Sequence, residues 1–197
     1  MKKILITGFE PFGAETTNSS WDAITALEEA IPNVGLVKLR LPVSFSKAPA
    51  LAIETIEREN PNAVICVGQA GGRACVNIER LAVNLANAVS ADADGYRPRN
   101  KPIIADGEPV LFTTIPVEEL VDAVRSCGVP CHPSQTAGLY VCNTLLYRVL
   151  HHFPSLPITF VHMPYSTAQV INKGKDTPSM SIGDMKRALM AVVTHIG

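Results

Sequence analysis

Three residues stand where this chain could carry nucleophilic chemistry. Cys142 lies at the predicted start of a helix, where backbone N–H groups and the helix dipole favour a thiolate and can receive an oxyanion. His162 ends a predicted strand, and ligands of α/β folds bind at such strand ends. Glu79 lies where a two-residue apolar period changes phase, and a carboxylate can hold an imidazole in one tautomer. A thiol, an imidazole and a carboxylate together suit covalent catalysis.

Each of these residues also has a purely structural interpretation. A cysteine is more often a buried thiol, a histidine a hydrogen-bonded core residue, and a glutamate an exposed strand residue. Sequence spacing alone does not bring the three together. The remaining histidines suit catalysis less well, because they fall late in predicted helices or after a proline turn: His132, His151, His152 and His195.

Two glycine turns and one cysteine pair offer other chemistry. Residues 8–13 and 68–73 follow predicted strands, but neither matches a dinucleotide or P-loop fingerprint, so a phosphate site there is only an alternative. The two phenylalanines of the first turn can belong to the core or form a flat apolar pocket. Cys127 and Cys131, beside His132, suggest zinc, but no second ligand pair follows, so we expect a helix-end thiol and a strand-start thiol with no metal.

Composition excludes several classes of protein. The chain is 47% hydrophobic and 18% charged with a net charge of -1, which allows a buried core and gives no field for nucleic acid or an anionic membrane. The N-terminal apolar run is too short for a signal peptide, and no stretch approaches the ~18 apolar residues of a spanning helix. Five cysteines, an odd number, argue against a disulfide framework. We therefore expect a cytoplasmic protein.

Predicted strands alternate with predicted helices, which indicates a layered α/β domain, and 197 residues fit one domain. The phase slip at Glu79-Arg80 predicts a bulge or bend, with two short separate strands as the alternative. A long polar loop is expected at 89–108 and another loop at 165–178. We expect strands at 3–7, 34–41, 63–67, 110–114 and 158–162, and helices at 19–31, 47–59, 116–127, 142–153 and 181–195.

Short motifs along nearly the whole chain resemble those of the pyroglutamyl peptidase I (pyrrolidone-carboxylate peptidase) family. They occur in family order and are highly specific together. The matching stretches are 7–13 (TGFEPFG), 18–21 (NSSW), 67–73 (VGQAGGR), 78–84 (IERLAVN), 134–138 (SQTAG), 140–143 (YVCN) and 160–165 (FVHMPY).

The resemblance implies a fold, an activity and a site. The fold is a three-layer αβα sandwich around a twisted mixed sheet, formed by residues 1–197 as a single domain. The activity is that of a cysteine peptidase acting on peptides with N-terminal pyroglutamate, without cofactor and usually as a homotetramer. The implied triad is Glu79, Cys142 and His162. The implied substrate-binding residues are Phe9 and Phe12 around the lactam ring, the backbone carbonyl of Gln69 for its N–H, and Asn18, Tyr140 and Val141.

The chain departs from the family pattern at residues 89–92. Many relatives continue Arg-Ile-Pro-Asp, whereas this chain reads Val-Ser-Ala-Asp. One hypothesis is that a wall of the pocket is lost. The other is that the loop closes differently and supplies Arg97 or Arg99. Two rival functions remain open: a phosphorylase-like enzyme with phosphate at a glycine turn, and a binding protein that kept the triad but lost the pocket.

Overall fold

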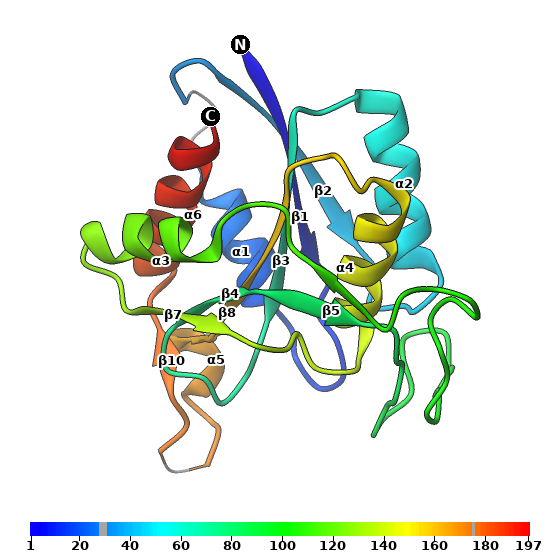
Figure 1. The fold of residues 1–197 in the computed structure, drawn as a ribbon. Coiled ribbons are helices and arrows are strands. Elements are labelled where there is room, and N and C mark those ends of the chain that lie inside the picture. Colours follow the sequence, from blue (N-terminus) through cyan, green and yellow to red (C-terminus); the bar gives the residue numbers. More distant parts are fainter. Residues whose placement is uncertain (28–30, 175) are drawn as a thin grey trace.

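A mixed six-stranded sheet forms the centre of the protein in the computed structural model, which describes residues 1–27, 31–174 and 176–197 (Figure 1). The strand order is β2-β1-β3-β8-β4-β7. Neighbouring strands are parallel except at the β4–β8 pair, which is antiparallel. The strands are β1 (Lys2–Phe9), β2 (Val34–Leu41), β3 (Ala63–Gln69), β4 (Val76–Glu79), β7 (Cys131–Ser134) and β8 (Ile158–Met163).

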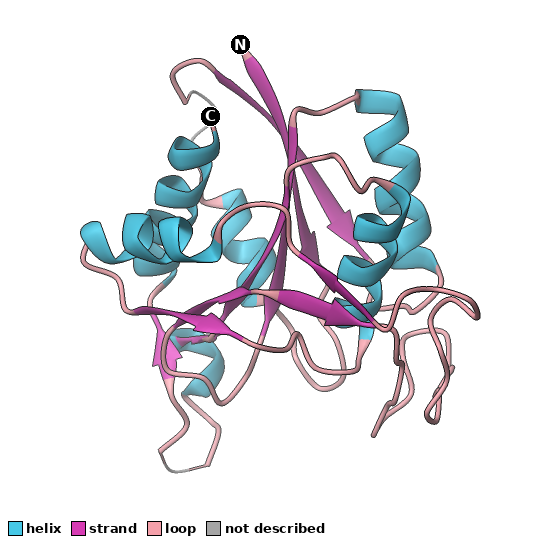
Figure 2. Cartoon of the chain, viewed as in Figure 1, coloured by secondary structure: helices cyan, strands magenta, loops and turns pink. Residues whose placement is uncertain are grey.

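Helices cover both faces of this sheet, as Figure 2 shows. Successive side chains of a strand point to opposite faces, so Ile4 joins one apolar core and Leu5 the other. The first core is closed by α1 (Ser19–Thr25), α3 (Val117–Ser126) and α6 (Ile182–Ile196), and the second by α2 (Lys47–Glu59) and α4 (Val141–His152). The central strands are apolar on both faces, as a sheet covered on both sides requires. The expected α/β fold with a mixed sheet between helices is confirmed.

The first helix is shorter than predicted. Asn18 caps α1 by accepting the Ser20 N–H at 3.1 Å, but the helix ends at Thr25 rather than at residue 31. Ile31 instead forms an isolated bridge with Val34. The residue before a proline disfavours helical geometry, and Pro32 follows Ile31, so Ile31 itself is a poor position for a helix. Residues 28–30 of the predicted helix lie outside the described residues.

At Glu79-Arg80, where the apolar alternation changes phase, the chain passes from one sheet to another. β4 ends at Glu79 in the main sheet, and β5 (Leu81–Val83) pairs antiparallel with β6 (Val110–Phe112) in a separate two-stranded sheet. Arg80 lies between them, and its N–H donates to Ser134 O at 2.9 Å. Two short separate strands therefore describe this segment, and the predicted bulge was wrong.

The long polar loop is anchored to the body of the protein. Within residues 89–108, all of which the structure describes, the only β pairing is an isolated bridge from Lys101 to Ala86. The buried Asp92 carboxylate accepts three backbone N–H groups, from Phe45 at 2.9 Å, Asp94 at 3.0 Å and Tyr96 at 2.8 Å. These bonds fix the loop against the start of α2.

The second predicted loop, 165–178, contains regular structure. β9 (Tyr165–Ser166) leads into the single-turn α5 (Thr167–Val170), and β10 (Ser179–Met180) pairs with β9. Ser166 and Gln169 form a reciprocal capping box that starts α5. Elements this short bury too little apolar surface to show a period, so no periodicity in the sequence marks them.

Candidate active site

Glu79 and His162 meet at the end of the antiparallel pair in the sheet. In the β4–β8 register Asn77 lies opposite His162, so Glu79, two residues further on, is its diagonal neighbour on the same face. His162 Nδ1 lies 2.6 Å from Glu79 Oε1, with Glu79 0% and His162 4% exposed. An ionised carboxylate only accepts hydrogen bonds, so Nδ1 carries the proton and Nε2 is left free to act as a base.

Cys142 is brought to the same place by the start of α4. It is the second residue of the helix, after Tyr140 as N-cap, whose side chain makes no capping bond. The first N–H groups of a helix have no partner within it, and that of Cys142 is one of them. Asn143 holds this helix start against β5, because its side chain exchanges 2.9 Å hydrogen bonds with both backbone groups of Val83.

The thiol of Cys142 and the imidazole of His162 lie side by side against Gly68. Gly68 is the β3 residue paired with His162 in β8. A Cβ at Gly68 would stand 2.9 Å from Cys142 Sγ, 2.9 Å from Phe160 Cζ and 3.1 Å from His162 Cδ2. These groups therefore occupy the space that any other residue's side chain would fill.

We expect Gly68→Ala to disrupt this arrangement. The new methyl group must push the thiol or the ring aside, which costs about 1–3 kcal/mol for overpacking in a buried site. Alkylation of Cys142 should slow and the thermal unfolding midpoint should fall. Gly183→Ala is the control, because a Cβ there meets only Ser181 Oγ at 3.7 Å. Equal behaviour of the two variants would mean that the site has room above residue 68.

The surroundings of Cys142 oppose its ionisation. Burial, then the charges of Glu79 and the Cys66 thiol, raise the pKa of Cys142 to about 12, while Arg73 acts in the opposite direction. A backbone hydrogen bond at the helix start favours the thiolate, as expected, but burial outweighs it. Deprotonation has to be coupled to proton uptake by His162 and helped by positive charge nearby.

A small pocket of about 240 Å³ opens beside the thiol. Its volume lies below the ~300–1,000 Å³ usual for drug-sized ligands, so it suits a single small residue. Phe12 and Tyr140 form part of its apolar wall, with ring centroids 5.8 Å apart. The lining residues are Phe9, Phe12, Ala14, Glu15, Asn18, Val43, Gln69, Tyr140, Val141, Cys142 and Tyr165.

Every pocket residue predicted from the sequence lines this cavity, but two polar ones have their side chains already engaged. Asn18 Nδ2 donates to Glu10 O at 2.9 Å while its oxygen caps α1. Gln69 Oε1 accepts from Ser19 N at 2.8 Å and from Gln169 Nε2 at 2.9 Å. Both side chains hold the walls of the pocket in place.

Some residues at the site were missed from the sequence. Glu15 and Tyr165 line the pocket, and Arg73 Nη1 lies 3.0 Å from Glu79 Oε1. Tyr165 had a signal, since it ends the stretch that carries His162. Arg73 belongs to a glycine turn considered for phosphate, and its guanidinium is paired with Glu79 instead.

The departure at residues 89–92 does not form a wall of the pocket. The Val89 side chain is 87% exposed and, like Ser90, does not line the cavity. The segment contributes through its backbone, because Tyr140 Oη donates to Ala91 O at 2.9 Å. The Arg97 side chain is engaged with the backbone of the loop, because its Nε donates to Ala88 O at 3.3 Å. Neither Arg97 nor Arg99 lines the pocket.

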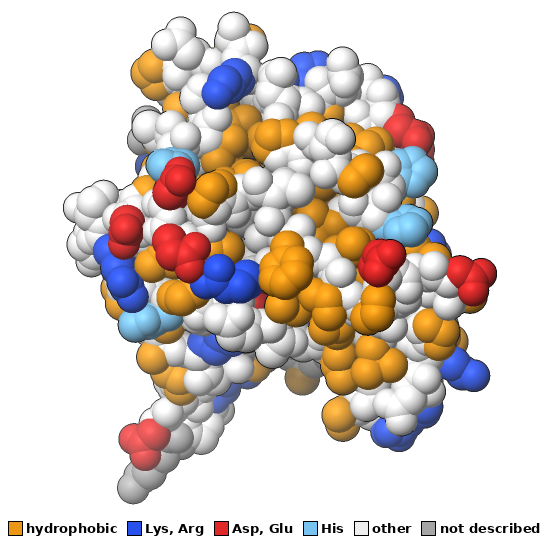
Figure 3. All heavy atoms as spheres, viewed as in Figure 1, with side chains coloured by type: hydrophobic (Ala, Val, Ile, Leu, Met, Phe, Trp, Pro, Cys, Tyr) orange, Lys and Arg blue, Asp and Glu red, His pale blue; other side chains and the backbone are white. Residues whose placement is uncertain are grey.

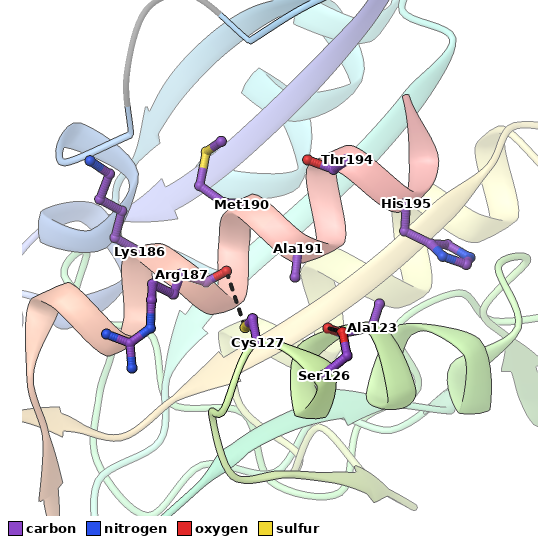
Figure 4. A pocket seen from close by; sticks show the side chains of 9 residues that line it. All are labelled: Ala123, Ser126, Cys127, Lys186, Arg187, Met190, Ala191, Thr194 and His195. Atoms are coloured by element: carbon purple, nitrogen blue, oxygen red, sulfur yellow. Dashed lines mark hydrogen bonds between the residues drawn. The ribbon is translucent and has the colours of Figure 1, made fainter.

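A larger cavity of about 500 Å³ lies between α3 and α6, on the sheet face opposite α4 (Figure 4). Cys127 faces it, with Sγ donating to Val124 O at 3.0 Å and to Arg187 O at 3.7 Å. Cys131 is buried at the start of β7, and His132 Nδ1 lies 3.1 Å from Arg125 Nη2. The two cysteines therefore lie at a helix end and a strand start, as expected.

Comparison with known proteins identifies the class and then the family. The family model described as pyroglutamyl peptidase matches residues 2–196. The pyrrolidone-carboxylate peptidase of Thermosipho africanus is 40% identical, over 98% of this chain and 96% of its own. The chain is thus a cysteine-type peptidase.

Solved structures agree. Pyroglutamyl peptidase I from Bacillus amyloliquefaciens superimposes with a TM-score of 0.94 at 36% identity, covering 100% of this chain and 97% of that one. Pyrrolidone carboxyl peptidase from Thermococcus litoralis gives 0.93 at 34% identity, covering 100% and 93%. The chain belongs to the pyroglutamyl peptidase family, and the resemblance found in its motifs is confirmed.

Proposed function

We propose that this protein removes pyroglutamate from peptide N-termini, with Cys142 as nucleophile, His162 as general acid and base, and Glu79 as its orienting carboxylate. The observation that carries the proposal is the Glu79–His162 hydrogen bond of 2.6 Å, with the ring beside Cys142 over Gly68 at the edge of a small pocket. Family membership supports the substrate class.

In the first step, Cys142 Sγ attacks the carbonyl carbon of pyroglutamate and its proton passes to His162 Nε2. The oxyanion is received by the free N–H groups at the start of α4. The C–N bond then breaks as His162 returns the proton to the leaving amine, which gives a pyroglutamyl thioester. Water attacks this thioester with His162 as base, pyroglutamic acid leaves, and the thiol is restored.

The shape and polarity of the pocket fit a lactam. Pyroglutamate has no free amine, so an acidic anchor of the aminopeptidase kind would not bind it. It offers two flat apolar faces and one amide group. Phe9 and Phe12 supply apolar surface, and the backbone carbonyl of Gln69 accepts the lactam N–H in our proposal. A substrate without that N–H leaves a polar group unpaired, which gives strong discrimination.

Hydrolysis of chromogenic amides tests the proposal. We expect release of the chromophore from a pyroglutamyl amide and at least about 100-fold lower kcat/KM for the prolyl amide, which has the ring without the lactam carbonyl. No turnover of the pyroglutamyl amide by folded protein would favour a binding protein. Nucleoside cleavage that depends on phosphate would favour the phosphorylase-like alternative.

We expect Tyr140→Phe to weaken substrate binding more than it slows the chemistry. The change removes the bond from Tyr140 Oη to Ala91 O, which holds residues 89–92 beside the pocket. One lost hydrogen bond is worth about 0.5–1.5 kcal/mol, so KM should rise about 2–10-fold with kcat nearly unchanged. Steady-state kinetics on the pyroglutamyl amide measure both. A fall in kcat alone would place Tyr140 in the chemical step.

We further propose a homotetramer in the cytoplasm, from the family resemblance. Figure 3 shows hydrophobic side chains gathered over β5 and β6, where Phe112 is 63% exposed. An apolar surface of this kind is typical of a subunit contact. Light scattering on the protein as it elutes from a size-exclusion column measures the number of subunits.

None of the helices in the described part of the chain has the length and apolar character that crossing a bilayer requires.

A further inference from the structure

Arg73 reaches the site from the turn that joins β3 to β4. Its backbone N–H donates to Ala70 O at 3.3 Å, which closes the turn. Its Nη1 lies 3.0 Å from Glu79 Oε1, the same oxygen that lies 2.6 Å from His162 Nδ1. Arg73 is partly exposed, with 31% of its side chain accessible, whereas that of Glu79 is 0% exposed. A surface arginine thus extends inward to a buried carboxylate.

The charges at the site explain why such a contact matters. When Cys142 has given its proton to His162, the buried site holds a thiolate, an imidazolium and the carboxylate of Glu79. Their sum is one negative charge in a medium that solvates charge poorly. The guanidinium brings the sum to zero. Among the residues that the structure describes, no other lysine or arginine is ion-paired with Glu79.

The other titratable groups around the thiol give no compensating charge. Glu79 and Cys66 both disfavour the thiolate, and Tyr140 is a neutral phenol whose pKa is itself raised, first by burial. In the described part of the chain, His162 and Arg73 are the groups beside Glu79 and the thiol that can carry positive charge. His162 is positive only during the reaction, whereas an arginine is always charged.

We propose that Arg73 is a positioning residue for this reaction: it holds the Glu79 carboxylate against His162 and supplies the permanent positive charge that lets the Cys142 thiolate form. This inference rests on the proposed function for its relevance to catalysis, but thiolate formation can be measured without any substrate.

The experiment measures alkylation of Cys142 by iodoacetamide against pH, with the modified peptide identified by mass spectrometry. The neutral variants are Arg73→Gln and Arg73→Met, and Arg73→Lys keeps the charge. Arg80→Gln is the matched control, because it removes a positive charge from the residue next to Glu79 whose side chain pairs with Glu118 on α3. Thermal unfolding of each variant checks the fold.

Removing a positive charge makes the thiolate–imidazolium pair less stable, so the pH midpoint of alkylation, which reports formation of that pair, should move up. We expect a rise of about one pH unit in both neutral variants, recovery in Arg73→Lys, and no movement in Arg80→Gln. The acidic limb of kcat/KM for the pyroglutamyl amide should move in the same direction.

Three results would overturn the proposal. The first is an alkylation rate that falls at every pH without a shift of the midpoint. The second is an equal shift in Arg80→Gln, which would make the effect a general one of net charge. The third is that neither neutral variant folds while Arg73→Lys does, which would give Arg73 a purely structural role. If the alkylation midpoint shifts but no pyroglutamyl amide is hydrolysed, the proposed function fails and the inference about Arg73 stands.

Discussion

Cys142→Ala is expected to abolish hydrolysis of a pyroglutamyl amide while the protein keeps its fold. Without the thiol no acyl-enzyme can form, and loss of a nucleophile costs at least about 10³-fold in kcat. Alanine keeps the Cβ and removes only a partly exposed sulfur at the start of α4, so packing changes little. Turnover and circular dichroism on the same sample test both halves of the prediction.

The other thiols provide the controls for this result. Cys66 and Cys131 are buried, and burial is the main cause that raises the pKa of each to about 12. Cys127→Ala, on the far face of the sheet, should retain full activity. Normal turnover by Cys142→Ala, or a large loss in Cys127→Ala, would show that the nucleophile has been misassigned.

His162→Ala is expected to remove about 10²–10⁴-fold of the activity, because both the attack and the departure of the amine need proton transfer. Glu79→Gln should lose less. The glutamine oxygen can still accept from Nδ1–H and orient the ring, whereas the charge that stabilises the imidazolium is gone. Steady-state kinetics of the two variants measure which substitution causes the larger loss of activity.

Histidines elsewhere serve as matched controls for this prediction. His132 lies beside Arg125, and His195 lies near Glu119, with 3.2 Å between His195 Nε2 and Glu119 Oε2. Alanine at either position should leave kcat within about 2-fold of the unmodified protein, because surface changes rarely matter beyond ~0.5 kcal/mol. If either control loses more activity than His162→Ala, the assignment of the base is wrong.

The central sheet could be predicted because its strands carry a strong local signal. The runs at 3–7, 63–67 and 158–162 are mostly apolar, and all three belong to inner strands of the sheet. Helix α2 has the predicted bounds, and α3, α4 and α6 each begin and end within about one residue of theirs. Amphipathic periodicity, capping residues and prolines are all local, so these elements can be read from a single sequence.

The elements that failed depend on partners far away in the chain. β4 and β5 share one apolar stretch, and their division at Arg80 is decided by which sheet each joins, β7 and β8 in one case and β6 in the other. The same holds for β7, whose four residues include a proline. No local pattern records these pairings.

The site shows the same division between local and distant information. Cys142 and His162 could be selected by their positions at a helix start and a strand end. Among local features, Glu79 was marked only by the phase slip and Arg73 only as the end of a glycine turn, because the partner of its guanidinium is defined by the folded turn. The identity of the pocket residues came from the family motifs, and the packing of Asn18 and Gln69 into its walls came from the structure.

The position of β4 in the sheet determines when the candidate site can form during synthesis of the chain. β4 lies between β8 and β7, both of which are made later on the ribosome. Contacts between residues so distant in sequence form late in folding. A nascent chain that has emerged only as far as α4 therefore carries Cys142 and has β7 available to pair with β4, but it lacks His162 and β8, the strand on the other side of β4. His162, the proposed base, reaches the thiol only when β8 enters the sheet, so a chain that ends before β8 lacks part of the proposed triad.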